Sequence, residues 1–170
     1  TTTDLTISLP PTLNFEPFGG YSKIAAVERH HNTGKIGVAV AKGYGIRNGA
    51  VASSVSHDSH NIIVIGDNDA DMAIAVNEII RTQGGYTVVE NGKVYETLAL
   101  PIMGLMSDAG FENVNEALQR MIQKAHQMGV ASQIDPFVTL SFLALPVIPE
   151  LRITPRGICK MTAKGPAILS

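Results

Sequence analysis

Residues Ser54–Asp69, SVSHDSHNIIVIGDND, place a dense polar segment directly before an apolar one. The polar part holds two histidines, an aspartate and several serines. Short runs of small or β-branched residues flank it, Ala50–Ala52 before it and Ile62–Ile65 after it. Such runs favour strands, so we predict two strands with a polar loop between them. A polar loop on a rigid scaffold is a common way to present a site.

A helix is predicted immediately after this stretch, over residues 68–83. Asn68 is a good N-cap, and acidic residues follow it in the first turn, where the helix dipole favours negative charge. Gly84 and Gly85 end the helix. Two further strands, Tyr86–Glu90 and Lys93–Leu98, are joined by Asn91-Gly92, a dipeptide that favours a type I′ hairpin turn.

Outside this central part, the pattern predicts further strands and a second helix. A capping box at Asn113 and Glu116 opens an amphipathic stripe, which predicts a helix over residues 113–128. Residues 135–145 are apolar on all sides and fit either a buried strand or a buried helix. The remaining predicted strands are Lys23–Arg29 and Ile36–Ala41.

The order of these elements predicts an α+β fold. We expect a single domain, with one or more mixed or antiparallel sheets of short strands packed by the two main helices, because the strands occur in adjacent runs. The domain is expected over residues 23–157. Residues 1–22, where Leu5, Ile7 and Leu9 alternate, form an edge strand, extended arm or linker, and residues 158–170 a tail.

The composition excludes several classes of protein. The chain has 170 residues, 45% hydrophobic and 16% charged, with a formal net charge of -2, which suits a compact domain. We expect no nucleic-acid partner and no membrane partner, because the chain has neither a basic field nor a long apolar run. Its first residues do not read as a signal peptide. Cys159 is the single cysteine, which points to the cytoplasm.

The segment His57-Asp58-Ser59-His60 carries the side chains best suited to metal binding or acid–base catalysis. In an extended chain His57 and His60 would point to opposite sides, whereas in a turn they can converge. Two imidazoles and a carboxylate suit a divalent metal or acid–base chemistry, but a closed zinc site needs four ligands. His30 and His31 could complete a set if their turn folds alongside. The alternative is a well-bonded structural turn.

Longer stretches resemble a known family. VERHHNTGKIGVAVAKGYGIRNGAVASSVSHDSHNIIVIGDNDADMAIAVNEI, GGYTVVENGKVYETLALPIMGLMSD and DPFVTLSFLALPVIPELRITPRG are similar to the C-terminal domain of bacterial and archaeal adenine deaminases, of the amidohydrolase superfamily. Such enzymes convert adenine and water to hypoxanthine and ammonia. The family's catalytic (β/α)₈ barrel, with its H-x-H pair and its divalent metal (Mn, Fe or Zn), is absent from this sequence.

The resemblance implies an accessory role in purine salvage. We expect His57, Asp58 and His60 to contribute to catalysis from outside the barrel, and Ser56 and Asn61 to contact the purine substrate. No metal is expected within this chain alone, which should be inactive by itself. The expected partners are the barrel of the same enzyme and further copies in a homo-oligomer such as a homodimer. The alternatives are a purely structural or dimerisation domain, and a stand-alone metal- or ligand-binding module.

Overall fold

A six-stranded antiparallel sheet forms the centre of the computed structural model, which describes residues 20–169. The strand order is β2-β1-β4-β3-β5-β6, and a smaller antiparallel sheet follows in the order β7-β8-β9. This α+β architecture confirms the predicted fold class. The strands of the large sheet are β1 (Tyr21–Val27), β2 (Ile36–Lys42), β3 (Gly49–Ser53), β4 (Ile62–Gly66), β5 (Gly85–Glu90) and β6 (Lys93–Ala99).

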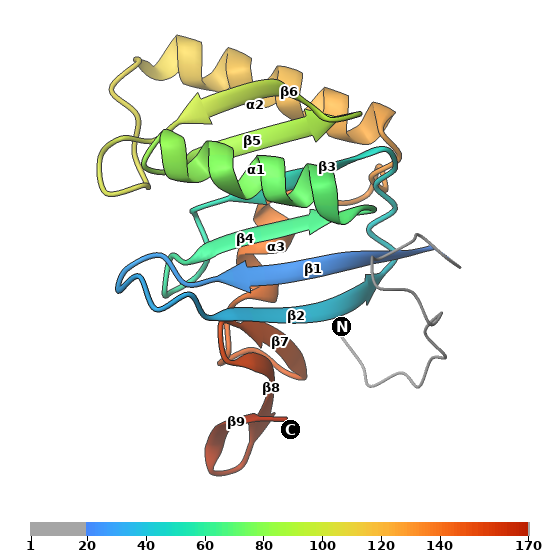
Figure 1. Cartoon of the computed structure of the whole chain (residues 1–170), viewed down its shortest axis with the longest axis vertical. Coiled ribbons are helices and arrows are strands. Elements are labelled where there is room, and N and C mark those ends of the chain that lie inside the picture. Colours follow the sequence, from blue (N-terminus) through green and yellow to red (C-terminus); the bar gives the residue numbers. More distant parts are fainter. Residues whose placement is uncertain (1–19, 170) are drawn as a thin grey trace.

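Helices cover both faces of the large sheet (Figure 1). Helix α1 (Asp69–Arg81) packs on one face, whereas α2 (Phe111–Gln127) and α3 (Pro136–Leu143) pack on the other. Side chains alternate between the two faces along each strand, so Ile62 and Val64 join the core under α1, and Ile63 and Ile65 join the core under α2 and α3. Burial on both faces explains why β4 reads as an uninterrupted apolar run.

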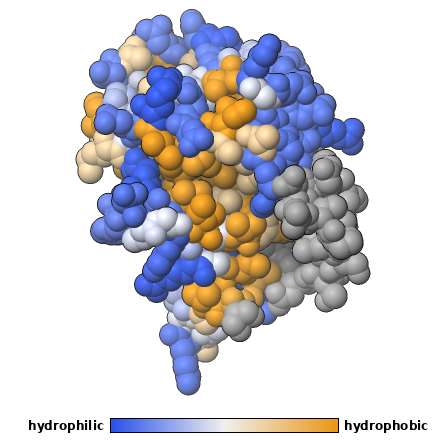
Figure 2. Space-filling model, viewed as in Figure 1, coloured by the Kyte–Doolittle hydropathy of each residue, from blue (hydrophilic) through white to orange (hydrophobic). Residues whose placement is uncertain are grey.

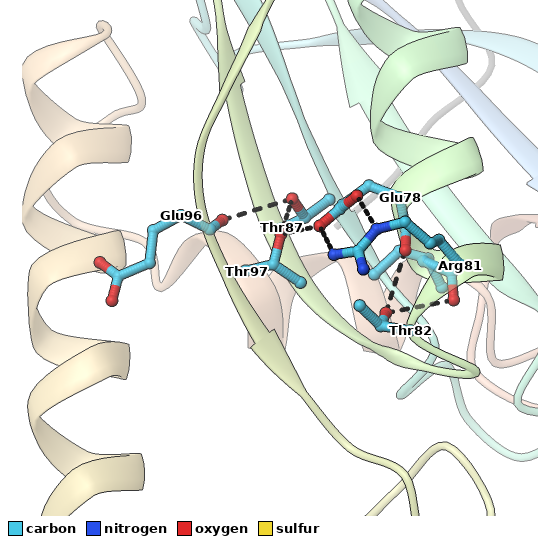
Figure 3. A network of polar contacts seen from close by, with 7 residues as sticks. Glu78, Arg81, Thr82, Thr87, Glu96 and Thr97 are labelled. Carbon is cyan, nitrogen blue, oxygen red and sulfur yellow. Dashed lines mark hydrogen bonds and ion pairs between the residues drawn. The ribbon is translucent and has the colours of Figure 1, made fainter.

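Helix α1 begins as predicted and is tied to the neighbouring hairpin. The Asn68 side chain accepts a hydrogen bond from the Asp71 amide at 2.8 Å. Toward the end of the helix, the Glu78 carboxylate accepts from Arg81 at 2.7 Å and from the Thr97 hydroxyl of β6 at 3.0 Å (Figure 3). Thr97 is also hydrogen-bonded to Thr87 of β5 at 2.9 Å. This network joins the helix to the β5–β6 hairpin through side chains.

The β5–β6 hairpin has the predicted turn. Asn91 and Gly92 both adopt positive φ, 50° and 77°, as a type I′ turn requires. The strands pair in antiparallel register, with an irregularity between Val88 and Val89.

Of the remaining helices, α2 begins differently from the sequence prediction, and α3 is one of the two alternatives that the prediction left open. Helix α2 starts at Phe111, and its N-cap is Gly110, which has no side chain to accept a capping hydrogen bond. The predicted capping box at Asn113 and Glu116 is therefore wrong. The side-chain amide of Asn113 instead donates a hydrogen bond to the Ala109 carbonyl at 2.8 Å. The ambiguous segment forms α3, because Asp135 caps it by accepting from the Phe137 and Val138 amides.

The last part of the chain forms three strands, although its sequence pattern indicated no regular structure there. Strand β7 (Leu151–Thr154) pairs with β8 (Gly157–Thr162), which pairs with β9 (Gly165–Ile168). This small sheet packs on β2 at Gly37, where a Cβ atom would collide with the Thr154 carbonyl oxygen. Two of its strands therefore lie largely in the segment predicted as a tail.

Two other sequence expectations concern the N-terminal arm and the absence of a membrane partner. The predicted arm falls almost entirely on residues 1–19, outside the described residues, and the first described strand begins at Tyr21. Among residues 20–169, no helix has the length and hydropathy needed to cross a membrane.

Candidate functional site

Three connecting segments meet at one end of the strands of the large sheet, at the left of Figure 1. They are residues 28–35 after β1, residues 54–61 between β3 and β4, and residues 101–106 after β6. The Ser54 hydroxyl donates to the Gly104 carbonyl at 2.6 Å, which holds the second segment against the third. The histidines singled out in the sequence lie on the first two segments.

The polar loop forms a turn, which brings His57 and His60 together. The His60 amide donates to the Ser56 carbonyl at 2.6 Å, and the Ser56 amide donates to His60 Nδ1 at 3.3 Å. The two imidazole rings lie edge to face with their centroids 5.8 Å apart. Of the two arrangements considered from the sequence, the converging one is therefore present.

His30 joins this pair from the neighbouring segment. Its Nε2 donates to the Ser59 carbonyl at 2.6 Å, because a carbonyl oxygen can only accept. The ring of the exposed His31 lies beside it, with centroids 6.4 Å apart. The two histidine segments fold alongside each other, as a shared site requires.

The hydrogen bond to Nδ1 also fixes the chemistry of His60. In its neutral form the imidazole must carry its proton on Nε2, since Nδ1 accepts the Ser56 amide. Partial burial lowers the pKa of His60, and the nearby His57 and Arg29 lower it further against an opposing effect of Asp58. A neutral imidazole with a free Nε2–H is suited to donating a hydrogen bond.

His57 and Asp58 occupy the outer part of the turn. The Asp58 side chain is 82% exposed, and its carboxylate lies 3.6 Å from His57 Nδ1. The His57 ring packs beside Phe142 with centroids 5.3 Å apart, and its amide donates to the Ser141 carbonyl of α3. Helix α3 thus supports the turn from behind.

Ser56 and Asn61 lie beneath the turn. They are only 1% and 8% exposed. The Asn61 side chain accepts from the Arg29 amide at 3.1 Å and donates to the Ser59 hydroxyl at 3.0 Å. Both residues hold the loop in its present shape.

Arg29 is a central residue that the sequence reasoning missed. Its guanidinium donates to three carbonyl oxygens, those of His60 at 3.0 Å, Gln83 at 3.4 Å and Met103 at 2.9 Å. Partial burial lowers its pKa. We call Arg29, His30, His57 and His60 the histidine edge. The only sequence signal for Arg29 is its place directly before the two adjacent histidines.

Glu28 organises the turn that carries His30. Its carboxylate accepts hydrogen bonds from the amides of Thr33, His31 and His30. These bonds, the one from Thr33 foremost, lower the pKa of Glu28 to about 2 against a smaller opposing effect of desolvation. The carboxylate is therefore engaged by its own turn.

Exposed apolar side chains surround the histidine edge. Met103 is 74% exposed, Met106 52%, and Ile102 and Phe142 each 44%. Within residues 20–169, no three His, Cys, Asp or Glu side chains are grouped so that they could hold a metal ion. The described residues therefore do not form a self-contained metal centre. Exposed apolar side chains bordered by polar groups are instead typical of a surface that meets another protein surface.

Comparison with known proteins identifies the family. The sequence profile described as "Adenine deaminase C-terminal domain" matches residues 4–164. The adenine deaminase of Desulfitobacterium hafniense is 53% identical over 144 residues, which cover 85% of this chain and 25% of that protein. The adenine deaminases of Clostridium acetobutylicum and Halalkalibacterium halodurans are 53% and 45% identical, over 82% and 83% of this chain. The chain spans about a quarter of the length of these curated relatives. It belongs to the adenine deaminase C-terminal domain family.

Proposed function

We propose that this chain works as the accessory C-terminal domain of an adenine deaminase, which converts adenine and water to hypoxanthine and ammonia. The names and greater length of the relatives support a catalytic domain elsewhere in the longer protein. We place the divalent metal (Mn, Fe or Zn) in that domain, because the described residues do not fit one. The single buried Cys159 suits a cytoplasmic enzyme of purine salvage.

The histidine edge is the part of the domain that we propose to meet the catalytic centre. The observation that carries this proposal is that the His57 and His60 rings lie together on a loop whose backbone carbonyls accept hydrogen bonds from His30 and Arg29 of a separate segment, beside exposed apolar side chains. A purely structural turn would not need several titratable rings at an exposed edge. We therefore propose that this edge lies at the mouth of the active site.

Each residue then has a distinct role. His60, neutral and protonated on Nε2, would donate a hydrogen bond to the substrate or to a ligand of the catalytic centre. His57, paired with the exposed Asp58, would move a proton toward the leaving ammonia. Ser56 and Asn61 remain candidates for substrate contact, although their burial requires the turn to open first.

Alanine substitutions in the full-length enzyme test this proposal. His57→Ala and His60→Ala should each lower kcat/KM for adenine by about 100-fold or more, the lower end of the range for a side chain that transfers a proton in the transition state. His126→Ala is the matched control, because His126 lies on α2 and contacts the Val130 carbonyl instead. Unchanged kcat/KM in both test variants would leave the loop with a structural role only.

Separate variants test the proposed roles of the exposed Asp58 and of the buried Ser56 and Asn61. Asp58→Asn keeps the shape of the side chain and removes its charge, so it should change the pH profile of kcat more than KM. Ser56→Ala and Asn61→Ala should raise KM if these side chains contact the purine, and should change only stability if they hold the turn.

A second candidate function is structural, with the domain helping to build a homodimer or larger homo-oligomer. The exposed Ile102, Met103 and Met106 favour it, together with Val138 and Phe142 of α3. Replacing Met103 and Met106 by glutamate would separate the possibilities. A halved native mass with normal activity per subunit would support oligomerisation, whereas normal mass with reduced activity would support contact with the catalytic domain.

The stand-alone binding module remains the third candidate. Elemental analysis of the purified chain before and after chelation tests it directly. Bound metal together with a melting temperature that falls on chelation would favour this module. We expect no such fall, and no deaminase activity from the chain alone.

A further inference from the structure

One apolar surface lies outside the histidine edge and has no role in the function proposed above. It consists of Val27, Ile36, Val38 and Val40 on β1 and β2, together with Ile80 on α1; we call it the β1–β2 strip. Ile36, Val38 and Ile80 are 56%, 48% and 58% exposed, which is a high exposure for large aliphatic side chains.

The strand register shows that these side chains share one face. Val27 pairs with Ile36, and Ala25 pairs with Val38. Ala25 and Val27 belong to the core under α1, and paired residues point to the same face of a sheet. Ile36 and Val38 therefore point to the α1 side of the sheet, at the edge strand that α1 leaves open.

Helix α1 contributes to the strip along its side. Asp69 at the start of the helix pairs with Lys23 of β1 at 2.6 Å, so that side of the helix faces β1. Ile80 falls close to the same side about three turns later, at 100° per residue. Figure 2 shows a band of hydrophobic surface crossing this face below α1.

The edge strand β2 carries few of the charged residues that usually protect a sheet edge, and the small sheet packs on its other face, at Gly37. Strand β2 reads IGVAVAK, with its single charge at the last position. The opposite edge strand, β6, carries Lys93 and Glu96, and Glu96 is paired with Arg120 of α2 at 2.6 Å. Since soluble proteins place charges on free edges, the contrast indicates that β2 is covered in the complete protein.

We propose that the catalytic part of the full-length protein covers the β1–β2 strip as well as the histidine edge. This inference rests on the proposed function. The strip is continuous with the histidine edge, because Val27 ends β1 two residues before Arg29. The relatives, of which this chain spans a quarter, contain ample further chain to cover both surfaces. One partner surface would then hold the histidines in position by resting on the neighbouring strip.

A charged substitution in the full-length enzyme tests the inference. Val38→Glu should raise the rate of limited proteolysis between the two parts by at least tenfold and lower the melting temperature of the catalytic part, with the native mass unchanged. Val94→Glu is the matched control, since Val94 is 39% exposed, pairs with Val89 of the core under α1, and lies on the opposite edge. It should leave both readouts unchanged.

Two results would overturn the inference. Equal behaviour of the two glutamate variants would mean that the strip is open to solvent. A halved native mass for Val38→Glu would mean that a second copy of the chain covers it. Val38→Ala, which adds no charge, should give a smaller change in the same direction and guards against misfolding of the glutamate variant. Proteolysis, melting temperature and native mass report on assembly and not on catalysis. They therefore test whether the β1–β2 strip is covered even if the histidine variants keep an unchanged kcat/KM.

Discussion

Replacing Arg29 by methionine should destabilise the domain and loosen its functional loop. Methionine keeps an unbranched apolar stem of similar length but removes the guanidinium donors to His60, Gln83 and Met103. A hydrogen bond that involves a charged group contributes about 1.5–3 kcal/mol. The three bonds are partly exposed and the one to Gln83 is long, at 3.4 Å, so each should contribute nearer to the value of about 0.5–1.5 kcal/mol for an ordinary hydrogen bond. We expect a loss of about 2–4 kcal/mol in the free energy of unfolding.

Urea unfolding of the chain, followed by circular dichroism, measures this loss. Arg156→Met is the matched control, because Arg156 is exposed on the turn between β7 and β8 and its backbone amide makes the bond to Thr154. That substitution should change the free energy of unfolding by less than about 0.5 kcal/mol. Amide exchange should also become faster near the three carbonyl partners of Arg29, while β4 stays protected.

The reasoning would be refuted if both methionine variants had the same free energy of unfolding. It would also be refuted if the loss for Arg29→Met appeared without faster exchange in residues 54–61 and 101–106. In that case the guanidinium would stabilise the fold without holding the segments of the histidine edge together.

Three further predictions concern neighbouring features. Gly104→Ala should lower the free energy of unfolding in urea by about 2 kcal/mol or more, because a Cβ atom would collide with the Arg29 guanidinium and because φ at this position is +75°. Asp135→Ala should cost about 1 kcal/mol by removing the cap of α3, measured in the same way. The Glu28 carboxylate has its pKa lowered to about 2 from 4.5, so it stabilises the fold fully above about pH 4.5 and progressively less as the pH falls toward 2. Glu28→Gln should therefore lower the urea midpoint at pH 7, and its difference from the unsubstituted chain should disappear near pH 2.

The features that the sequence predicted well depend on local interactions. Asn91-Gly92 defines its turn through its own backbone preferences, and Asn68 caps a helix whose acidic first turn directly follows it. Residues 135–145 remained ambiguous because an apolar run buried on all sides has no distinguishing period. The pattern around Asn113 suggested a cap, but the helix begins earlier, at a glycine.

The site was predicted less completely because its geometry depends on distant segments. The convergence of His57 and His60 required the turn, and the approach of His30 required two separate hairpin connections to lie side by side. Arg29 could not be predicted, since its partners are backbone carbonyls, which any residue supplies. The strands β8 and β9 lack strong alternation because the small sheet is only partly buried.

The single cysteine makes the small sheet a natural reporter of local opening. Cys159 of β8 is 2% exposed, and desolvation raises the pKa of its thiol, so a thiol reagent can react only when this sheet separates from the rest of the fold. The labelling rate, compared with that of a free thiol, gives the population of that open state without any engineered probe. The peripheral sheet can thus be followed separately from the six-stranded sheet in a single kinetic experiment.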